Sequence, residues 1–184
     1  EMVQRESLSS YHQAAGEAEG LPFQGGKFDR CFVAFSLHHF KDPALMVKDS
    51  LRVLKPRGRL VVLDPVVVEP QDNIDHSIHE VVNRVFGGSH GGVFRFHTAK
   101  EIRQLIEGAG FKVTRSDVHQ APFDQDGMDG IPTGRHWLEA AEELAAKPEM
   151  KKRFEENYFQ FWRSGDKTHV KGRFHFALIC GEKI

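Results

Sequence analysis

The chain has 184 residues, enough for one domain with a buried core, and 40% of them are hydrophobic. Its 25 basic and 26 acidic residues nearly cancel, which gives no electrostatic reason to expect a nucleic-acid or anionic-membrane partner. No apolar stretch is long enough to span a bilayer and no signal peptide is found, so we expect a soluble, cytoplasmic protein without membrane insertion. Cys31 and Cys180 lie in apolar runs and fit buried, reduced thiols.

The first half of the chain predicts two central strands that flank a helix. Residues 11–15 form a weak strand candidate, and Pro and Gly at 21–26 predict a turn. The runs 31–36 and 59–64 are apolar without alternation, which is typical of parallel strands covered by helices on both faces. Between them, a helix begins at Asp42-Pro43 and ends before Pro56-Arg57-Gly58.

The second half predicts further helices, two strands and an insertion. We expect a helix at 71–86, a flexible loop at 87–92, and a helix that starts with a capping box at Thr98 and Glu101. Strands are expected at 111–119 and 174–180. Between them, residues 121–172 predict a helical insertion or cap within a single domain that spans 1–184. That insertion contains a loop at 124–134 and an aromatic helical hairpin at 135–162, broken at Pro148.

Several motifs in the first third occur in a fixed order. They are GEAEGLPF at 16–23, FD at 28–29, LHHF at 37–40, DP at 42–43 and RVLKPRGRLVVLD at 52–64. This order and spacing resembles the middle of a class I AdoMet-dependent methyltransferase, of the branch that includes ubiquinone and menaquinone C-methyltransferases. The resemblance covers residues 1–64 well and 98–119 fairly, and the strand pattern extends it to 174–183.

The resemblance implies an α/β fold: a three-layer, Rossmann-like sheet with family strand order 3-2-1-4-5-7-6 and an antiparallel last strand. No Gly-x-Gly-x-Gly loop precedes Glu17. We therefore expect this sequence to lack family strands 1 and 2, to build the order 4-5-7-6, and to bind AdoMet weakly by itself.

The same resemblance assigns the cofactor contacts. The Glu17 carboxylate and the Ala18 backbone occupy the position that contacts adenine, while Phe35, Ser36 and Leu37 occupy the position that contacts the methionine part of S-adenosyl-L-methionine. The alternative for Glu17 is an ordinary solvated carboxylate.

Candidate acceptor-side residues follow the predicted strands. His38 and His39 could orient a small-molecule methyl acceptor or take its proton, or they could simply pack against the helix start. Asp64 could bind the acceptor or satisfy a turn. His90, in a loop that could act as a lid, and the aromatic residues Trp137 and Tyr158 are further acceptor-side candidates.

The remaining histidines predict no metal site. His76, His79, His90 and His97 match no zinc-ligand spacing, and no cysteine accompanies them. We interpret them as solvated or substrate-lining residues.

Two functional hypotheses follow. The first is AdoMet-dependent methyl transfer to a small organic acceptor. The second is a non-catalytic, methyltransferase-like remnant that associates with itself or a related subunit. The strand at 31–36 would then have an open, apolar edge, so we expect either a symmetric homodimer through that strand or coverage by residues 1–15.

Overall fold

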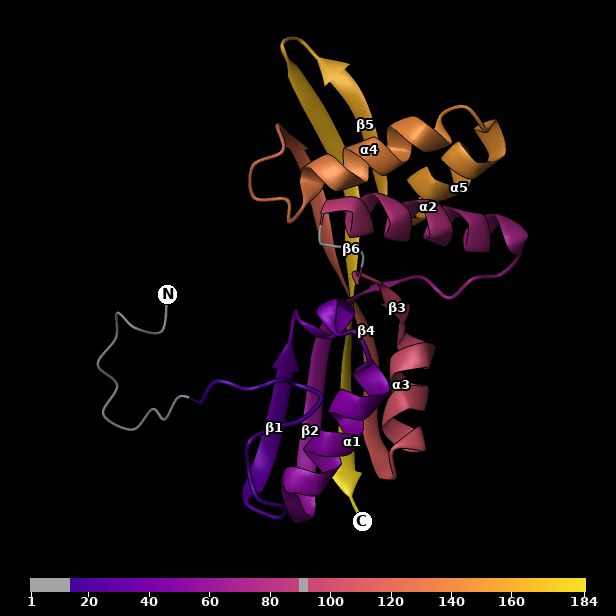
Figure 1. Cartoon of the computed structure of the whole chain (residues 1–184). Coiled ribbons are helices and arrows are strands. Elements are labelled where there is room, and N and C mark those ends of the chain that lie inside the picture. The colour runs from indigo at the N-terminus through magenta and orange to yellow at the C-terminus, as the bar shows by residue number, and fades with distance from the viewer. Residues whose placement is uncertain (1–13, 90–92) are drawn as a thin grey trace.

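The computed structural model describes residues 14–89 and 93–184. Its sheet contains, in spatial order, β1 (Phe28–Ala34), β2 (Leu54–Val67), β6 (Lys167–Lys183) and β4 (Phe111–Asp126) (Figure 1). β1 runs parallel to β2, whereas β6 is antiparallel to both of its neighbours. In the family numbering, β1, β2, β6 and β4 correspond to strands 4, 5, 7 and 6. The predicted order 4-5-7-6 and the antiparallel last strand are thus confirmed. Short β3 (His97–Thr98) pairs with β2, and β5 (Phe159–Ser164) pairs with β6.

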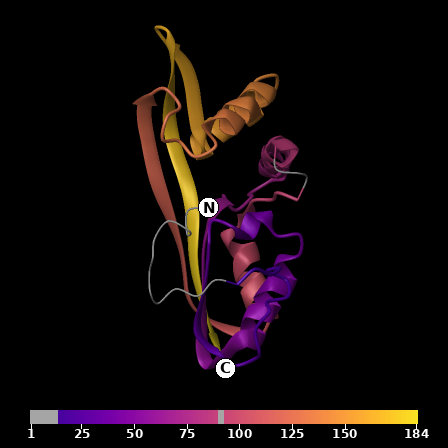
Figure 2. The same ribbon diagram turned by 60° about the vertical axis from the view of Figure 1, so that its left-hand side comes forward.

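The helices are α1 (Pro43–Val53), α2 (Asn73–Ser89), α3 (Ala99–Gly108), α4 (Gly134–Leu144), α5 (Pro148–Asn157) and the short 3-10 helix η2 (Leu37–His39). Figure 2 shows them on one side of the sheet. Leu60 and Val62 are fully buried in the cluster that includes α1 and α3, while Val61 and Leu63, which alternate with them, are only partly buried. Phe32, the β1 partner of Val61, is 65% exposed. Within the described residues the helices cover one face, so the predicted second helical layer is not among them.

Two predicted helix starts are confirmed in atomic detail. The Asp42 carboxylate accepts a hydrogen bond from the Leu45 amide at 3.0 Å, and Pro43 occupies the first turn of α1. At α3 the Thr98 hydroxyl accepts from the Glu101 amide, while the Glu101 carboxylate accepts from the Thr98 amide. This reciprocal capping box fixes where α3 begins.

Residues 73–89 and 121–172 form a second group of elements, which we call the cap. The cap contains α2, α4, α5, β5 and the outer parts of β4 and β6, and it lies far from the chain's carboxyl terminus (Figure 1). The predicted helical hairpin is wrong in its last part, because α5 ends at Asn157 and residues 159–164 form β5. Phe159 and Phe161 alternate with polar Gln160, and a two-residue Gly165-Asp166 turn returns the chain into β6. Gly172 permits this pairing, since a Cβ there would lie 2.1 Å from the Tyr158 carbonyl oxygen.

Other boundaries also differ from the prediction. Residues 87–89, expected in a loop, continue α2, and 90–92 lie outside the described residues. β4 and β6 are each longer than expected because they pair continuously as far as Asp126 and His169. The helix that is predicted to end before Pro56-Arg57-Gly58 already ends at Val53, and residues 54–58 belong to β2. Residues 14 and 15 are not in a strand, and the rest of the strand predicted at 11–15 lies outside the described residues.

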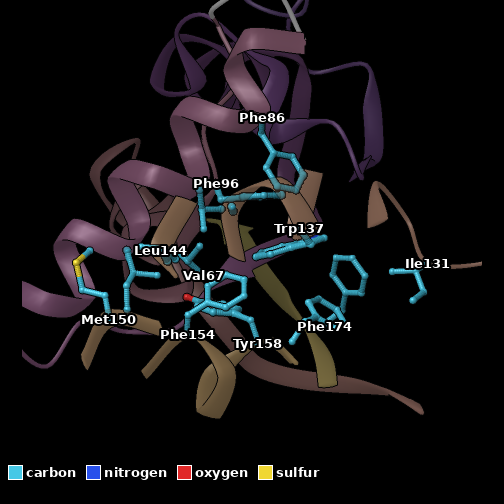
Figure 3. Packing of buried hydrophobic residues seen from close by; sticks show 14 of the residues in the cluster. Val67, Phe86, Phe96, Ile131, Trp137, Leu144, Met150, Phe154, Tyr158 and Phe174 are labelled. Atoms are coloured by element: carbon cyan, nitrogen blue, oxygen red, sulfur yellow. The ribbon is translucent and has the colours of Figure 1, made fainter. Parts of the chain in front are cut away.

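Two hydrophobic clusters stabilise the sheet and the cap. The sheet cluster lies between β2, β6, α1 and α3 and is largely aliphatic. The cap cluster is rich in aromatic side chains, and Figure 3 shows Trp137 among Phe96, Phe174 and Tyr158. The Trp137 ring stacks on Phe96 and Tyr158 at centroid distances of 5.8 and 5.3 Å. The predicted aromatic stripe of the insertion is therefore mainly core.

Candidate functional site

The backbone turns sharply where β1 ends. Phe35 has a φ of 50°, a left-handed conformation that is unfavourable for a bulky side chain. Its amide still donates to the Leu63 carbonyl at 2.8 Å, so the strand ladder with β2 reaches this residue. Strained backbone of this kind persists only where surrounding contacts enforce it, and such positions cluster at functional sites.

Asp64, which lies within β2 beside the end of β1, supplies the enforcing contacts. Its Oδ1 accepts hydrogen bonds from the amides of Ser36 and Leu37, at 2.9 and 3.2 Å. Its Oδ2 accepts from the His38 amide at 3.2 Å and bonds the His38 ring Nδ1 at 2.8 Å. The side chain is 1% exposed. These four donors fill the acceptor sites of both oxygens, so Asp64 organises the loop and is not available to a substrate. The turn-satisfying alternative for Asp64 thus replaces its predicted substrate contact.

The Asp64 contact also sets the chemistry of His38. An ionised carboxylate only accepts hydrogen bonds, so it holds the proton on Nδ1 of His38 and leaves Nε2 as the ring's acceptor nitrogen. The His38 ring is buried against Phe94 and Phe96, at centroid distances of 4.9 and 5.7 Å. A carboxylate–imidazole pair of this type can accept a proton from a bound molecule.

The neighbouring His39 is exposed and lies 4.2 Å from the His38 ring, centroid to centroid. Its ring also meets the edge of Phe94. The Arg95 amide donates to the His38 carbonyl at 3.0 Å, which ties segment 94–96 to η2. The structure therefore brings both predicted histidines together, one buried and oriented, the other at the surface.

The turn at 17–20 is anchored beside this loop. Gly20 donates its amide to the Glu17 carbonyl, and the Glu19 carboxylate accepts from the Asp42 amide at the start of α1. Further along, Arg52 bonds the Leu21 and Phe23 carbonyls. Ala18 packs on the sheet cluster, whereas Glu17 is exposed. The bond between the Glu19 carboxylate and the Asp42 amide thus joins two segments. One segment contains Glu17 and Ala18, and the other follows β1.

Backbone groups near Phe35 differ in what they can still bind. The amides of residues 36–38 are all bonded to Asp64. The next donor of the parallel ladder to the Phe35 carbonyl would be residue 65, but Pro65 has no N–H. Among the described residues no group donates to this carbonyl. The loop consequently presents a free acceptor and no free donor at its first three amides.

The cap-side candidates lie in the cap core. The Tyr158 hydroxyl is paired twice, with the Val68 amide and with Nε2 of His79, both at 3.1 Å. Burial raises the pKa of Tyr158, so its hydroxyl stays protonated and donates to His79. Tyr158 therefore joins α5, α2 and the end of β2, which corrects its predicted substrate role. Trp137 is 3% exposed, and His90 lies outside the described residues.

Three further histidines are buried and held neutral. Desolvation by burial is the main cause that lowers the pKa of His79, His97 and His175 below the ordinary value. His79 bonds Tyr158, and Nε2 of His175 bonds the Asn157 carbonyl at 2.8 Å. His169 in β6 behaves in the opposite way, because hydrogen bonds to Asp126 and Asp124 raise the pKa of this half-buried side chain.

Some features of the site gave no recognised signal in the sequence. The His38 ring contacts Phe94 and Phe96, while Trp137 contacts Phe174 and Phe35 contacts Phe176. The two Phe-x-Phe pairs, 94–96 and 174–176, are the sequence signal that could have indicated these aromatic surroundings. A groove of about 520 Å³ beside α3 is lined in part by His97, and one of about 530 Å³ beside α2 is lined in part by His76 and His79, residues that the sequence predicts to be solvated or substrate-lining. The other candidate site residues in the described part of the chain do not line these grooves. In residues 14–89 and 93–184, no three His, Cys, Asp or Glu side chains are grouped to hold a metal. Over the same residues, no helix is long and apolar enough to cross a membrane.

Replacing Asp64 by Asn should destabilise the protein by about 1–3 kcal/mol, because an amide N–H₂ would then face the His38 amide donor in a buried position. Urea unfolding measures the change. Asp117→Asn, on the same sheet but paired with Arg115 at the surface, should change the free energy of unfolding by less than about 0.5 kcal/mol. Equal effects of the two substitutions would contradict the role given to Asp64.

Acidification from pH 7.5 to 5.5 should lower the free energy of unfolding. The unfolded chain binds protons at ordinary histidine pKa values near 6.5, whereas folded His79, His97 and His175 have lower pKa values, so the unfolded state binds more protons in this window. His169, with its raised pKa, stabilises the fold at low pH and loses this contribution as pH rises. His169→Gln should therefore steepen the acid loss. If the free energy of unfolding of His169→Gln does not change between pH 7.5 and 5.5, the lowered pKa values given to His79, His97 and His175 are wrong.

Comparison with known proteins agrees with the geometry. A family model described as a methyltransferase domain matches residues 1–62. The mitochondrial 2-methoxy-6-polyprenyl-1,4-benzoquinol methylase of Homo sapiens is 31% identical over 113 residues, covering 54% of this chain and 35% of the relative. The ubiquinone/menaquinone biosynthesis C-methyltransferase UbiE of Shewanella sediminis is 36% identical over 124 residues, covering 66% of this chain and 43% of the relative. The chain thus spans less than half the length of these curated relatives.

Solved structures share the fold. A Bacillus halodurans protein described as a methyltransferase superposes with a TM-score of 0.69 at 21% identity, covering 91% of this chain and 69% of that one. The YcgJ protein from Bacillus subtilis gives a TM-score of 0.63 at 20% identity, with the same coverage. The motifs, the strand order and these similarities together support a class I AdoMet-dependent methyltransferase of the branch that includes the ubiquinone and menaquinone C-methyltransferases.

Proposed function

We propose that the protein functions in AdoMet-dependent methyl transfer to a small organic acceptor. The observation that carries this proposal is the loop after β1. It combines a strained Phe35, a Phe35 carbonyl to which no group of residues 14–89 and 93–184 donates, and an Asp64-oriented His38 at the carboxyl end of a parallel strand. Open α/β sheets bind their ligands at this end of the strands.

Each candidate residue has a distinct part in this proposal. S-adenosyl-L-methionine, when bound, supplies a methyl group on a sulfonium that is already a good leaving group, so the protein mainly positions the reactants. The Phe35 carbonyl would accept from the ammonium of the methionine part, beside Ser36 and Leu37. Exposed Glu17 and the Ala18 amide would face adenine.

On the acceptor side, Nε2 of His38 would take a proton from the acceptor, while Asp64 keeps Nδ1 protonated. His39, whose ring is tilted by 47° against that of His38, would contact the acceptor at the surface. The curated relatives act on benzoquinol or ubiquinone and menaquinone precursors according to their names, which supports an acceptor that carries an apolar ring.

AdoMet should bind this chain weakly, with a dissociation constant above the micromolar range, because the sequence contains no Gly-x-Gly-x-Gly loop. Amide resonances of Ala18, Ser36 and Leu37 should shift when millimolar AdoMet is added to ¹⁵N-labelled protein. Glu17→Ala should weaken binding by about 1–3 kcal/mol through the lost charged hydrogen bond. Glu107→Ala, on the exposed side of α3, is the control and should bind as the wild type does. Unchanged shifts in Glu17→Ala would remove Glu17 from the site.

A second proposal concerns association. The outer edge of β1 is unpaired within the described residues, and Phe32 beside it is 65% exposed. Such edges pair with other chains. We expect a homodimer through β1; the other cover expected for this edge, residues 1–15, lies outside the described residues except for 14 and 15. Light scattering across a concentration series should show the mass doubling, whereas Phe32→Lys should shift the equilibrium towards monomer. A concentration-independent monomer would disprove this.

The unpaired thiols of Cys31 and Cys180 support a reducing, cytoplasmic location.

A further inference from the structure

Trp137 carries a buried donor without an acceptor. Its ring is 3% exposed, and Nε1 has no hydrogen-bond partner in the described part of the chain. Buried indole N–H groups usually find a partner, since leaving a desolvated donor unpaired is unfavourable. This donor lies in an aromatic cluster (Figure 3). An unpaired N–H in such surroundings is unfavourable and therefore requires an explanation.

The neighbouring side chains offer only ring surfaces. Phe96 and Tyr158 stack on the two sides of the indole, and Phe174 meets it edge-on at 5.6 Å, centroid to centroid. The Tyr158 hydroxyl is occupied by Val68 and His79 and is not bonded to Trp137. The indole N–H therefore either points at a ring face or awaits an oxygen from a bound molecule.

A row of aromatic rings connects Trp137 to the methyl-transfer site. Phe174 lies 5.6 Å from Trp137, Phe176 lies 5.9 Å from Phe174, and Phe35 meets Phe176 at 5.8 Å. We call Trp137, Phe174, Phe176 and Phe35 the ring row. Its inner end is buried in the cap, and its outer end, Phe35, is 53% exposed after β1. A flat apolar molecule against this row would have one end near the proposed methyl donor and the other near Trp137.

The segment beside Trp137 contains strained and flexible backbone. Thr133, which precedes α4, has a φ of 53° and makes no side-chain cap, and Gly127 and Gly130 have φ values of 86° and 78°. Ile131 and Met128 of this segment pack on the cap cluster. The Gly127 amide also donates to the Thr168 carbonyl, and the Gln125 side chain donates to the Asp129 carbonyl. A movement of the segment would have to break these bonds, while it would relieve the strain at Thr133.

We propose that Trp137 recognises the methyl acceptor, with its Nε1–H donating to an oxygen at the end of the molecule away from the methylated atom. The ligand class is a flat, apolar molecule with a hydrogen-bond-accepting oxygen, which lies along the ring row after segment 127–133 moves. This inference rests on the proposed methyl transfer, because only that function places a reacting atom near Phe35.

The test uses two probes of equal shape, acetophenone and α-methylstyrene, in which a CH₂ group replaces the carbonyl oxygen. The protein contains two tryptophans, so its ¹⁵N–¹H spectrum has two indole signals, and exposed Trp162 provides an internal reference. Acetophenone should move the Trp137 N–H signal downfield, while α-methylstyrene should leave its proton shift near the free value. Trp137→Phe keeps a ring in place and should weaken acetophenone binding about fivefold. Trp162→Phe should bind it like the wild type.

Three results would overturn the proposal: the Trp137 signal responds equally to both probes, it responds to neither at millimolar concentration, or Trp137→Phe binds acetophenone as tightly as the wild type. If Trp137→Phe does not fold, the two-probe comparison on the wild type decides alone. The two-probe test contains no AdoMet, so it is independent of the cofactor titration. If AdoMet fails to bind while the Trp137 signal responds as expected, the proposed cofactor site is wrong. If AdoMet binds while the Trp137 signal does not respond, the proposed role of Trp137 is wrong.

Discussion

The carboxylate of Asp64 is the contact on which the rest of the site depends. It lies within one parallel strand and binds three consecutive amides that follow the next strand. A buried carboxylate is costly unless its oxygens are satisfied, and here four donors satisfy them. The same bonds hold Phe35 in a left-handed conformation and direct His38 into its aromatic surroundings. The direction in which the chain enters α1, and hence the place of Glu19 on Asp42, follows from this loop.

The cap depends on a comparable arrangement of buried polar groups in an aromatic core. Tyr158 links α5 to α2 and to the amide of Val68, directly after β2. Arg153 of α5 pairs with buried Asp75 of α2 at 3.1 Å, which joins the same two helices at the rim. Burial lowers the pKa values of His79 and His175, so protonation of these two histidines in acid lowers the stability of the fold.

The sequence predicted the features that depend on local pattern and failed where tertiary contacts decide. The resemblance implied the sheet order, which the pairing of the strands bears out, while the Asp42-Pro43 start and the Thr98 capping box predicted the starts of two helices correctly. Residues 158–162 fitted a helical stripe, but pairing with β6 and the space at Gly172 made them a strand. The strain at Phe35 has no local signature, since it is imposed by Asp64 from a strand that is 28 residues away in sequence. The exposed sheet face around Phe32 was likewise not expected, because both strands carry the composition of strands covered on two sides.

The electrostatics of the loop favour a cation over an anion. In phosphate-binding loops, free amides at a helix start attract negative charge. Here the amides at the start of η2 are already bonded to Asp64, so no donor remains there for an anion. What the loop presents instead is the Phe35 carbonyl, left without its ladder donor by Pro65, and the nearby Glu17 turn with its exposed carboxylate. Acceptors of this kind suit an ammonium or a sulfonium, and both groups occur in AdoMet. A single Asp-Pro pair within β2 thus accounts for two properties of the site, because Asp64 removes the donors and Pro65 frees the acceptor.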